Sequence, residues 1–308
     1  MTMSGEVVAL LSALLWAFAS VLMGWGVRRL HVIPLNLIRC VVSTAFFWGL
    51  LPFFGGLKAI AAIPVEQWLW LFLSVVMLLI VGDLLYFRSL DLAGVSWTMP
   101  VASVNPLWAV LLAAVFVDEP LSWKLLAGTL LVIAGLVLVS RSTNSTGPVD
   151  HQRQRIGLLL ALLTSVAWAV GLVILKPAAE GLDSAVANSV RQPMAALLML
   201  GLSVARDHWP PSRQKHAARM TGGTWKDLRE LDRRSWLIIV IASLVGTGLG
   251  SLLFVQAIQM VGAGRTAVLT STAPLMAIPL AVLWLHERPN RRTLIGALLA
   301  TAGIILVV

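Results

Sequence analysis

The chain has 308 residues, of which 58% are hydrophobic and 12% are charged. Soluble domains carry roughly 45–50% apolar and about 25% charged residues, so this composition excludes an ordinary soluble protein and predicts a polytopic membrane protein. The single cysteine, Cys40, excludes an intramolecular disulfide. The net charge of +9 would suggest nucleic acid on a soluble domain. Here the basic residues lie mostly between apolar runs, where anionic headgroups attract them, so we expect membrane lipids as partners and no nucleic acid.

Apolar runs along the chain predict an all-α membrane protein with ten transmembrane helices, since about 20 apolar residues cross a bilayer. The expected spans cover residues 6–27, 34–55, 67–91, 95–117, 122–140, 156–175, 184–205, 235–260, 265–285 and 292–308. An even number of spans places both termini on the same side of the membrane. A polar stretch at 141–155 predicts a linker between two units, residues 1–140 and residues 156–308.

The two units repeat each other. A shift of 152 residues places Trp16 on Trp168 and Arg39 on Arg191. A shift of 168 residues aligns further pairs in the later part of each unit: Gly82 with Gly250, Gly94 with Gly262, Pro106 with Pro274, Glu119 with Glu287, Gly128 with Gly296, and Gly135 with Gly303. The shifts differ because the second unit carries an insertion in a basic loop at 206–234. Five helices per unit is an odd number, so the two copies enter the membrane from opposite sides, and such inverted repeats recur in secondary transporters.

The order of the repeated residues carries a family resemblance. Each unit has a mid-helix Trp, an Arg in its second helix, and a Pro in its fourth helix, which ends at a Glu. The Glu lies within Val-Asp-Glu-Pro-Leu-Ser at 117–122 and Leu-His-Glu-Arg-Pro-Asn at 285–290, and Gly-Ala-Gly-Arg at 262–265 opens the ninth helix. Each unit resembles an EamA-type repeat of the drug/metabolite transporter superfamily. The resemblance implies helices packed around a central cavity, transport of amino acids, other metabolites or drugs by alternating access, and residence in a bacterial or archaeal inner membrane.

The distribution of Lys and Arg conflicts with the usual orientation of this family. Sixteen of the basic residues fall in loops on the side opposite the termini, and four fall on the side of the termini. The positive-inside rule places the richer side in the cytoplasm and therefore favours external termini. The family resemblance implies the reverse, with both termini in the cytoplasm.

Three arginines and one aspartate lie inside the expected spans, where charged residues are costly and usually functional. We interpret Arg39 and Arg191 as anchors for a carboxylate or phosphate, although both could instead extend to lipid headgroups. Asp83 is interpreted as neutralising an arginine on another helix, as a proton site, or as a contact for a substrate amine. Tyr86, at i+3 from Asp83, shares its helix face, whereas Arg88, at i+5, points about 140° away.

Trp16 and Trp168 lie in mid-span, away from the interfacial positions where Trp concentrates. They serve either as core packing or as an aromatic wall of the cavity. The full set of candidate substrate-binding residues is Arg39, Arg191, Asp83, Tyr86, Trp16, Trp168, Arg88 and Asn188.

Three further patterns predict local structure. Glu119 and Glu287 are expected to accept hydrogen bonds from the free N–H groups of the helix that follows each of them. Proline kinks in the fourth and ninth helices are expected to line a cavity, at Pro100, Pro106, Pro274 and Pro279. Glycines spaced seven residues apart predict close packing of the fifth and tenth helices, at Gly128, Gly135, Gly296 and Gly303.

The excess of embedded arginine over aspartate favours a small anionic or zwitterionic cargo, such as an amino acid, with a possible coupling proton. Two alternatives stay open, a flippase for lipids or lipid-linked headgroups and a drug exporter. An intramembrane enzyme needs a nucleophile–base pair or a metal cluster, and the five histidines lie near helix ends or in polar stretches. We therefore expect no catalytic residue, no metal site and no cofactor.

Overall fold

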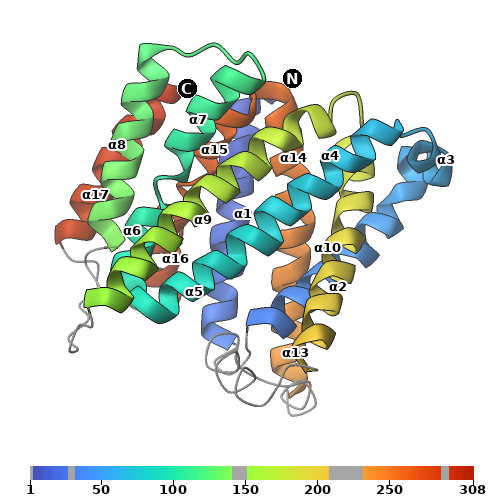
Figure 1. Ribbon diagram of the computed structural model, residues 1–308, viewed down its shortest axis with the longest axis horizontal. Helices are drawn as coiled ribbons and strands as arrows, with labels where there is room; N and C mark the ends of the chain where they lie inside the picture. Colours follow the sequence, from blue (N-terminus) through green and yellow to red (C-terminus); the bar gives the residue numbers. More distant parts are fainter. Residues whose placement is uncertain (1–2, 27–31, 141–150, 208–231, 286–290) are drawn as a thin grey trace.

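A computed structural model describes residues 3–26, 32–140, 151–207, 232–285 and 291–308. These residues form helices and no strand, which confirms the expected all-α class for the described part of the chain. The start of α1 and the end of α17 lie at the same end of the helix bundle (Figure 1), here called the terminal end. The opposite end is called the far end.

The first unit begins at the terminal end with α1 and finishes at the far end with α8 (Figure 1). Its elements are α1 (Gly5–Gly26), α2 (Val32–Leu50), the 3-10 turn η1 (Leu51–Phe54), α3 (Gly56–Ala61), α4 (Val65–Val75), the π-helical η2 (Val76–Gly82), α5 (Asp83–Ala93), α6 (Val95–Ala102), α7 (Asn105–Phe116) and α8 (Trp123–Ser140).

The second unit has matching elements in the same order. They are α9 (His151–Ala178), α10 (Ser184–Asp207), α13 (Arg233–Ala242), the π-helical η3 (Ser243–Gly250), α14 (Ser251–Val261), α15 (Ala263–Thr270), α16 (Ala273–Leu285) and α17 (Arg291–Val307). α1 begins at the terminal end, whereas its counterpart α9 begins at the far end (Figure 1). The two units are therefore inverted relative to each other, as the repeat predicted.

Each of the ten expected apolar runs coincides with described helix. Six stretches in the described residues are long and apolar enough to cross a membrane: Gly5–Met23, Leu35–Phe54, Val65–Leu90, Trp97–Phe116, His151–Ala178 and Arg233–Val261. Four further crossings stay a prediction. α9 begins at His151, so residues 151–155, expected in the linker, already belong to the helix.

Both units break their fourth helix at the same place. Gly94, with φ 76°, precedes α6, and Gly262, with φ 89°, precedes α15. Each of these eight-residue helices is followed by a serine at its C-cap, Ser103 or Ser271. A new helix then starts with a proline in its first turn, Pro106 in α7 and Pro274 in α16. Proline is tolerated in a first turn because the N–H groups there have no intrahelical acceptor.

α8 and α17 pack closely along the side of the bundle (Figure 1). A Cβ atom added to Gly128 would lie 2.7 Å from the carbonyl oxygen of Gly303, and one added to Gly296 would lie 2.6 Å from that of Gly135. Only glycine permits backbones to approach this closely, so the expected packing role of these glycines is confirmed.

Candidate functional site

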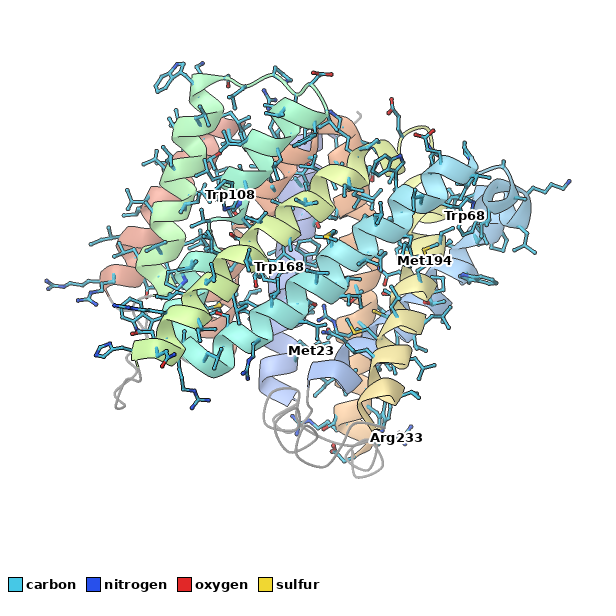
Figure 2. All side chains as sticks on the ribbon, in the orientation of Figure 1. Met23, Trp68, Trp108, Trp168, Met194 and Arg233 are labelled. Atoms are coloured by element: carbon cyan, nitrogen blue, oxygen red, sulfur yellow. The ribbon has the colours of Figure 1, made fainter. Side chains whose placement is uncertain are left out.

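A cavity of about 480 Å³ lies between the two units, within the size range typical of small-molecule sites, roughly 300–1,000 Å³. Six of the eight candidate residues line it: Trp16, Arg39, Asp83, Tyr86, Trp168 and Arg191. Figure 2 shows Trp168 midway along α9, in the middle of the bundle. The structure therefore brings most of the predicted site together from both repeats.

The two arginines are held in the same way by their own helices. Arg39 donates from Nη1 to Oδ1 of Asn36 at 3.2 Å, and Arg191 donates from Nη1 to Oδ1 of Asn188 at 3.3 Å. In both cases the asparagine lies three residues earlier, on the same helix face. The sequence repeat thus reproduces one orienting contact in both copies.

The second contact of each arginine differs. Nε of Arg39 donates to Oγ1 of Thr247 in η3 at 3.2 Å, whereas Nε of Arg191 donates to Oγ of Ser74 in α4 at 3.3 Å. In the described part of the chain, neither guanidinium has a carboxylate within 4.0 Å or a hydrogen-bond partner for Nη2. Each therefore keeps an amino group for another acceptor.

Trp16 reaches from α1 of the first unit to the π-helical segment of the second. Its Nε1 donates to the carbonyl oxygen of Gly246 at 3.0 Å. A Cβ on Gly250 would lie 2.7 Å from the indole ring, so glycine provides the space for the ring. The ring centroid is 5.0 Å from that of Phe254.

Trp168 makes the equivalent contact in the other direction, and here the symmetry is broken. Its ring lies over Gly82, and its centroid is 5.2 Å from that of Tyr86, the counterpart of Phe254. Nε1 of Trp168 donates to Oδ1 of Asp83 at 3.1 Å instead of to a backbone carbonyl. Both tryptophans line the cavity and also pack on a glycine. The two roles considered from the sequence, core packing and cavity wall, are therefore compatible.

Asp83 is the single carboxylate among the described residues that line the cavity. Ser251 occupies the equivalent position in the second unit and also lines the cavity. Trp168 is the hydrogen-bond partner of the Asp83 side chain within the described residues, so one carboxylate oxygen is left for another donor.

Two candidate residues lie elsewhere. Asn188 is fully buried, and its Nδ2 donates to the carbonyl oxygens of Ser184 at 2.9 Å and Ser251 at 3.1 Å. It orients Arg191 instead of lining the cavity, because its NH2 group donates to a carbonyl oxygen of its own helix and to that of Ser251 in α14. Arg88, although a candidate for the substrate site, is absent from the described lining, because its position five residues from Asp83 places it on another face of α5.

Several lining residues were not selected from the sequence. They include Gln192 and Cys40, whereas the polar side chains expected beside the prolines, Ser103, Asn105, Thr270 and Ser271, also line the cavity. The predicted cavity-lining role is confirmed for Pro274 and for the helix breaks themselves, whereas Pro100 and Pro279 lie inside helices and are not among the described lining residues. The sequence repeat could have indicated Gln192. This residue directly follows Arg191, and the shift of 152 residues aligns it with Cys40, which directly follows Arg39.

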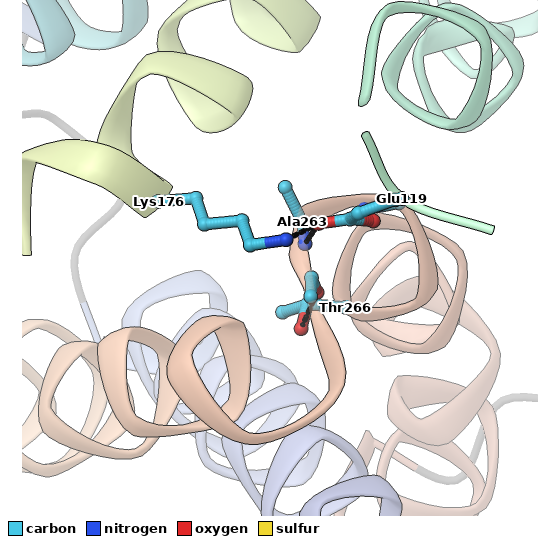
Figure 3. A network of polar contacts seen from close by, with 6 residues as sticks. Glu119, Lys176, Ala263 and Thr266 are labelled. Atoms are coloured by element: carbon cyan, nitrogen blue, oxygen red, sulfur yellow. Dashed lines mark hydrogen bonds and ion pairs between the residues drawn. The ribbon is translucent and has the colours of Figure 1, made fainter. Parts of the chain in front are cut away.

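Glu119 follows α7, which ends at the terminal end (Figure 1), and it joins the two units there through contacts with α15 and α9 (Figure 3). It accepts hydrogen bonds from the backbone N–H groups of Ala263 at 2.6 Å and Gly264 at 2.9 Å, and it lies 3.0 Å from Nζ of Lys176. A Cβ on Gly262 would lie 2.5 Å from the carboxylate, so this glycine permits the approach.

The expectation that Glu119 would cap the following helix was therefore wrong. The helix that follows, α8, is capped by Ser122, whose Oγ accepts from the N–H of Leu125 at 3.1 Å. The carboxylate instead caps α15 of the other unit, because folding brings the N-terminus of α15 beside the end of α7. Glu287 lies outside the described residues.

Other contacts between the units also lie at the terminal end. Gln67 donates to the carbonyl oxygen of Glu180 at 2.8 Å, and Glu6 lies 3.5 Å from Arg265. A buried apolar cluster from both units packs beneath them and includes Leu71, Ala109, Leu175, Val255 and Ile258. The protein is therefore closed at this end.

The open volume continues in the opposite direction. A second hollow of about 310 Å³ shares Trp16 and Arg39 with the first and follows α1 as far as Met23. Figure 2 shows Met23 toward the far end of the bundle. The site thus lies between a closed terminal end and hollows that extend toward the far end.

Comparisons with known proteins agree with this architecture. The model of the EamA-like transporter family matches residues 3–141 and 155–308, one match for each repeat. An uncharacterized transporter of Archaeoglobus fulgidus is 25% identical over 299 residues, which cover 97% of this chain and 95% of that protein. The uncharacterized inner membrane transporter YhbE of Escherichia coli K12 is 22% identical over 155 residues, covering 50% of this chain and 43% of YhbE.

A protein of known crystal structure shares the fold, with a TM-score of 0.77 at 19% identity over 98% of this chain and 95% of the other. The family matches cover both repeats, and the site between these repeats is built from residues of both. The chain belongs to the EamA-like transporter family and is an integral membrane transporter.

Proposed function

We propose that the protein is a secondary transporter that moves a small anionic or zwitterionic metabolite, such as an amino acid, by alternating access. The observation that carries this proposal is the pair of arginines in one cavity without a carboxylate within 4.0 Å in the described structure. An embedded arginine costs about 2.5–3.5 kcal/mol on insertion scales. Two such residues, with one aspartate nearby, favour an anionic group as the missing partner.

The cavity offers each part of a zwitterion a suitable contact. The free Nη2 groups of Arg39 and Arg191 are donors for a carboxylate or phosphate. Asp83 has one oxygen available for an ammonium group or a coupling proton. The rings of Trp16 and Trp168 provide apolar surface for the hydrocarbon part of the cargo.

The contacts at the terminal end support alternating access. Glu119, Gln67 and Glu6 belong to the first unit, and their partners belong to the second. Opening this end requires these contacts to separate while the far end closes, and inverted repeats permit this exchange because each unit can take the conformation of the other.

The family and its relatives support a location in the inner membrane of a bacterial or archaeal cell, and the charge distribution supports an orientation with the far end in the cytoplasm. Described basic residues at the far end are Arg153, Arg155, Arg233, Arg234, Arg291 and Arg292, against Lys58, Lys124, Lys176 and Arg265 at the terminal end. This orientation places both termini outside.

The test is ligand binding followed by transport. Purified protein is screened by thermal shift against L-amino acids, dicarboxylates and sugar phosphates, since a ligand of the native state raises its apparent stability. Compounds that bind are then measured by counterflow in proteoliposomes. We expect Arg39→Gln and Arg191→Gln each to reduce binding at least tenfold.

Lys58→Gln is the matched control, because it removes an exposed positive charge outside the cavity. It should leave binding unchanged. Unaltered anion binding in both arginine variants, or stabilisation by lipophilic cations alone, would contradict the proposal.

A further inference from the structure

Gln192 carries a buried amide that has no partner among the described residues. Its side chain is 5% exposed, it lines the cavity, and its Oε1 accepts no hydrogen bond. No hydrogen bond in the described part of the chain involves either end of this amide, so exchanging its oxygen and nitrogen does not change the observation. Buried polar groups are normally paired, and an exception requires an explanation.

The place of this amide distinguishes it from the other unpaired atoms. Four buried side-chain atoms lack a partner in the described structure: Ser43 Oγ, Gln67 Oε1, Trp108 Nε1 and Gln192 Oε1. Gln192 alone among these four residues lines the cavity. Gln67 in addition uses its Nε2 to bond the carbonyl oxygen of Glu180.

The residue before Gln192 is fixed in position. Arg191 is held by Ser74 and Asn188 and lines the same cavity. A cargo whose carboxylate is bound by Arg191 would therefore occupy the cavity that the Gln192 amide also lines.

The repeat also separates the role of Gln192 from that of the arginines. Arg39 and Arg191 are equivalent in the two units, whereas the counterpart of Gln192 is Cys40, whose thiol is a weak hydrogen-bonding group. A symmetric pair of arginines supplies charge without distinguishing one end of a cargo from the other. An amide present in one unit supplies that distinction.

We infer that Gln192 is a specificity-determining residue of the transport site, whose carbonyl oxygen accepts a hydrogen bond from an N–H group of a cargo anchored by Arg191. This assignment rests on the proposed function. An anion without an N–H group leaves the Gln192 carbonyl unpaired and is therefore discriminated against.

The first test measures stability without ligand. Gln192→Met keeps the length of the side chain and removes the amide, so the melting temperature of the free protein should stay the same or rise. The matched control is Gln67→Met, which loses the hydrogen bond to Glu180 and should lower the melting temperature. A fall for Gln192→Met as large as that for the control would assign Gln192 a structural role and overturn the inference.

The second test measures binding by calorimetry with L-leucine and 4-methylpentanoate, which share a carboxylate and a hydrocarbon chain and differ in the ammonium group. Gln192→Met should weaken L-leucine about five- to tenfold, as expected for one lost hydrogen bond, and leave 4-methylpentanoate within twofold. Gln67→Met should alter neither. Equal weakening of both compounds, or none, would overturn the inference.

Failure of the wild-type protein to bind either compound would count against the proposed function itself. The melting temperatures of the ligand-free variants would still test the role of Gln192, because that measurement involves no ligand. The two proposals therefore fail by different observations.

Discussion

Replacing Glu119 with glutamine removes the negative charge that joins the two units at the terminal end. The carboxylate accepts from two N–H groups at the start of α15, and its side chain is 10% exposed, against 32% for Lys176. A glutamine carbonyl can accept from one of these donors, but its NH2 group then faces the other. A carboxylate at a helix N-terminus contributes about 0.3–1 kcal/mol, and up to ~2 kcal/mol when partly buried.

The ion pair with Lys176 adds less than about 1 kcal/mol, because the lysine is partly exposed to solvent. The total loss for Glu119→Gln is roughly 2 kcal/mol, which corresponds to a factor of about 30 in an equilibrium constant. These contacts break when the terminal end opens, so the substitution should raise the population of the open form by about that factor.

Cys40 provides the assay, because it is the sole cysteine of the chain and lines the cavity. In vesicles, a membrane-impermeant maleimide added on the side of the terminal end reacts with Cys40 in proportion to the population of molecules open at that end. We expect Glu119→Gln to accelerate this reaction about 30-fold.

The matched control is Glu66→Gln, which removes an exposed carboxylate at the terminal end that bonds Trp70 of its own helix. It should leave the reaction rate unchanged. A Glu119→Gln rate within twofold of wild type, or an equal acceleration by the control, would refute the argument that this contact stabilises closure.

The remaining predictions concern packing, the cavity wall and orientation. Gly135→Ala should lower the free energy of unfolding by about 1–3 kcal/mol, since the added methyl group meets the backbone of Gly296; thermal unfolding that matches wild type would contradict the close packing. Trp168→Phe keeps a ring in the cavity but removes the hydrogen bond to Asp83. The transport rate in proteoliposomes should therefore fall severalfold with little loss of melting temperature. An unchanged rate would show that transport does not require Trp168 to position Asp83. If the far end is cytoplasmic, an impermeant maleimide should label Cys40 readily in inside-out vesicles and slowly in intact cells, and the opposite pattern would reject the orientation derived from charge.

The sequence by itself determined the helices and their repetition. Apolar runs long enough for a bilayer can satisfy their backbone hydrogen bonds only as helices or closed barrels, and the run lengths here match helices. The spacing from Trp to Arg recurs in both units, so Trp16, Trp168, Arg39 and Arg191 could be assigned to one cavity before any coordinates. Asp83 was found because charge is rare inside a span.

The tertiary structure alone decided which groups are paired and which are left for a ligand. The sequence shows that Asn188 and Gln192 share α10 with Arg191. It does not show that the amide of Asn188 is hydrogen-bonded to backbone carbonyls, whereas the amide of Gln192 is unpaired in the described structure. It likewise shows a carboxylate at Glu119, but not that its partners lie 144 and 145 residues away. Local spacing fixes the face of a helix on which a residue lies, whereas the helix opposite that face depends on how two inverted units pack. That packing is asymmetric here, closed at one end, although the sequence that produces it repeats.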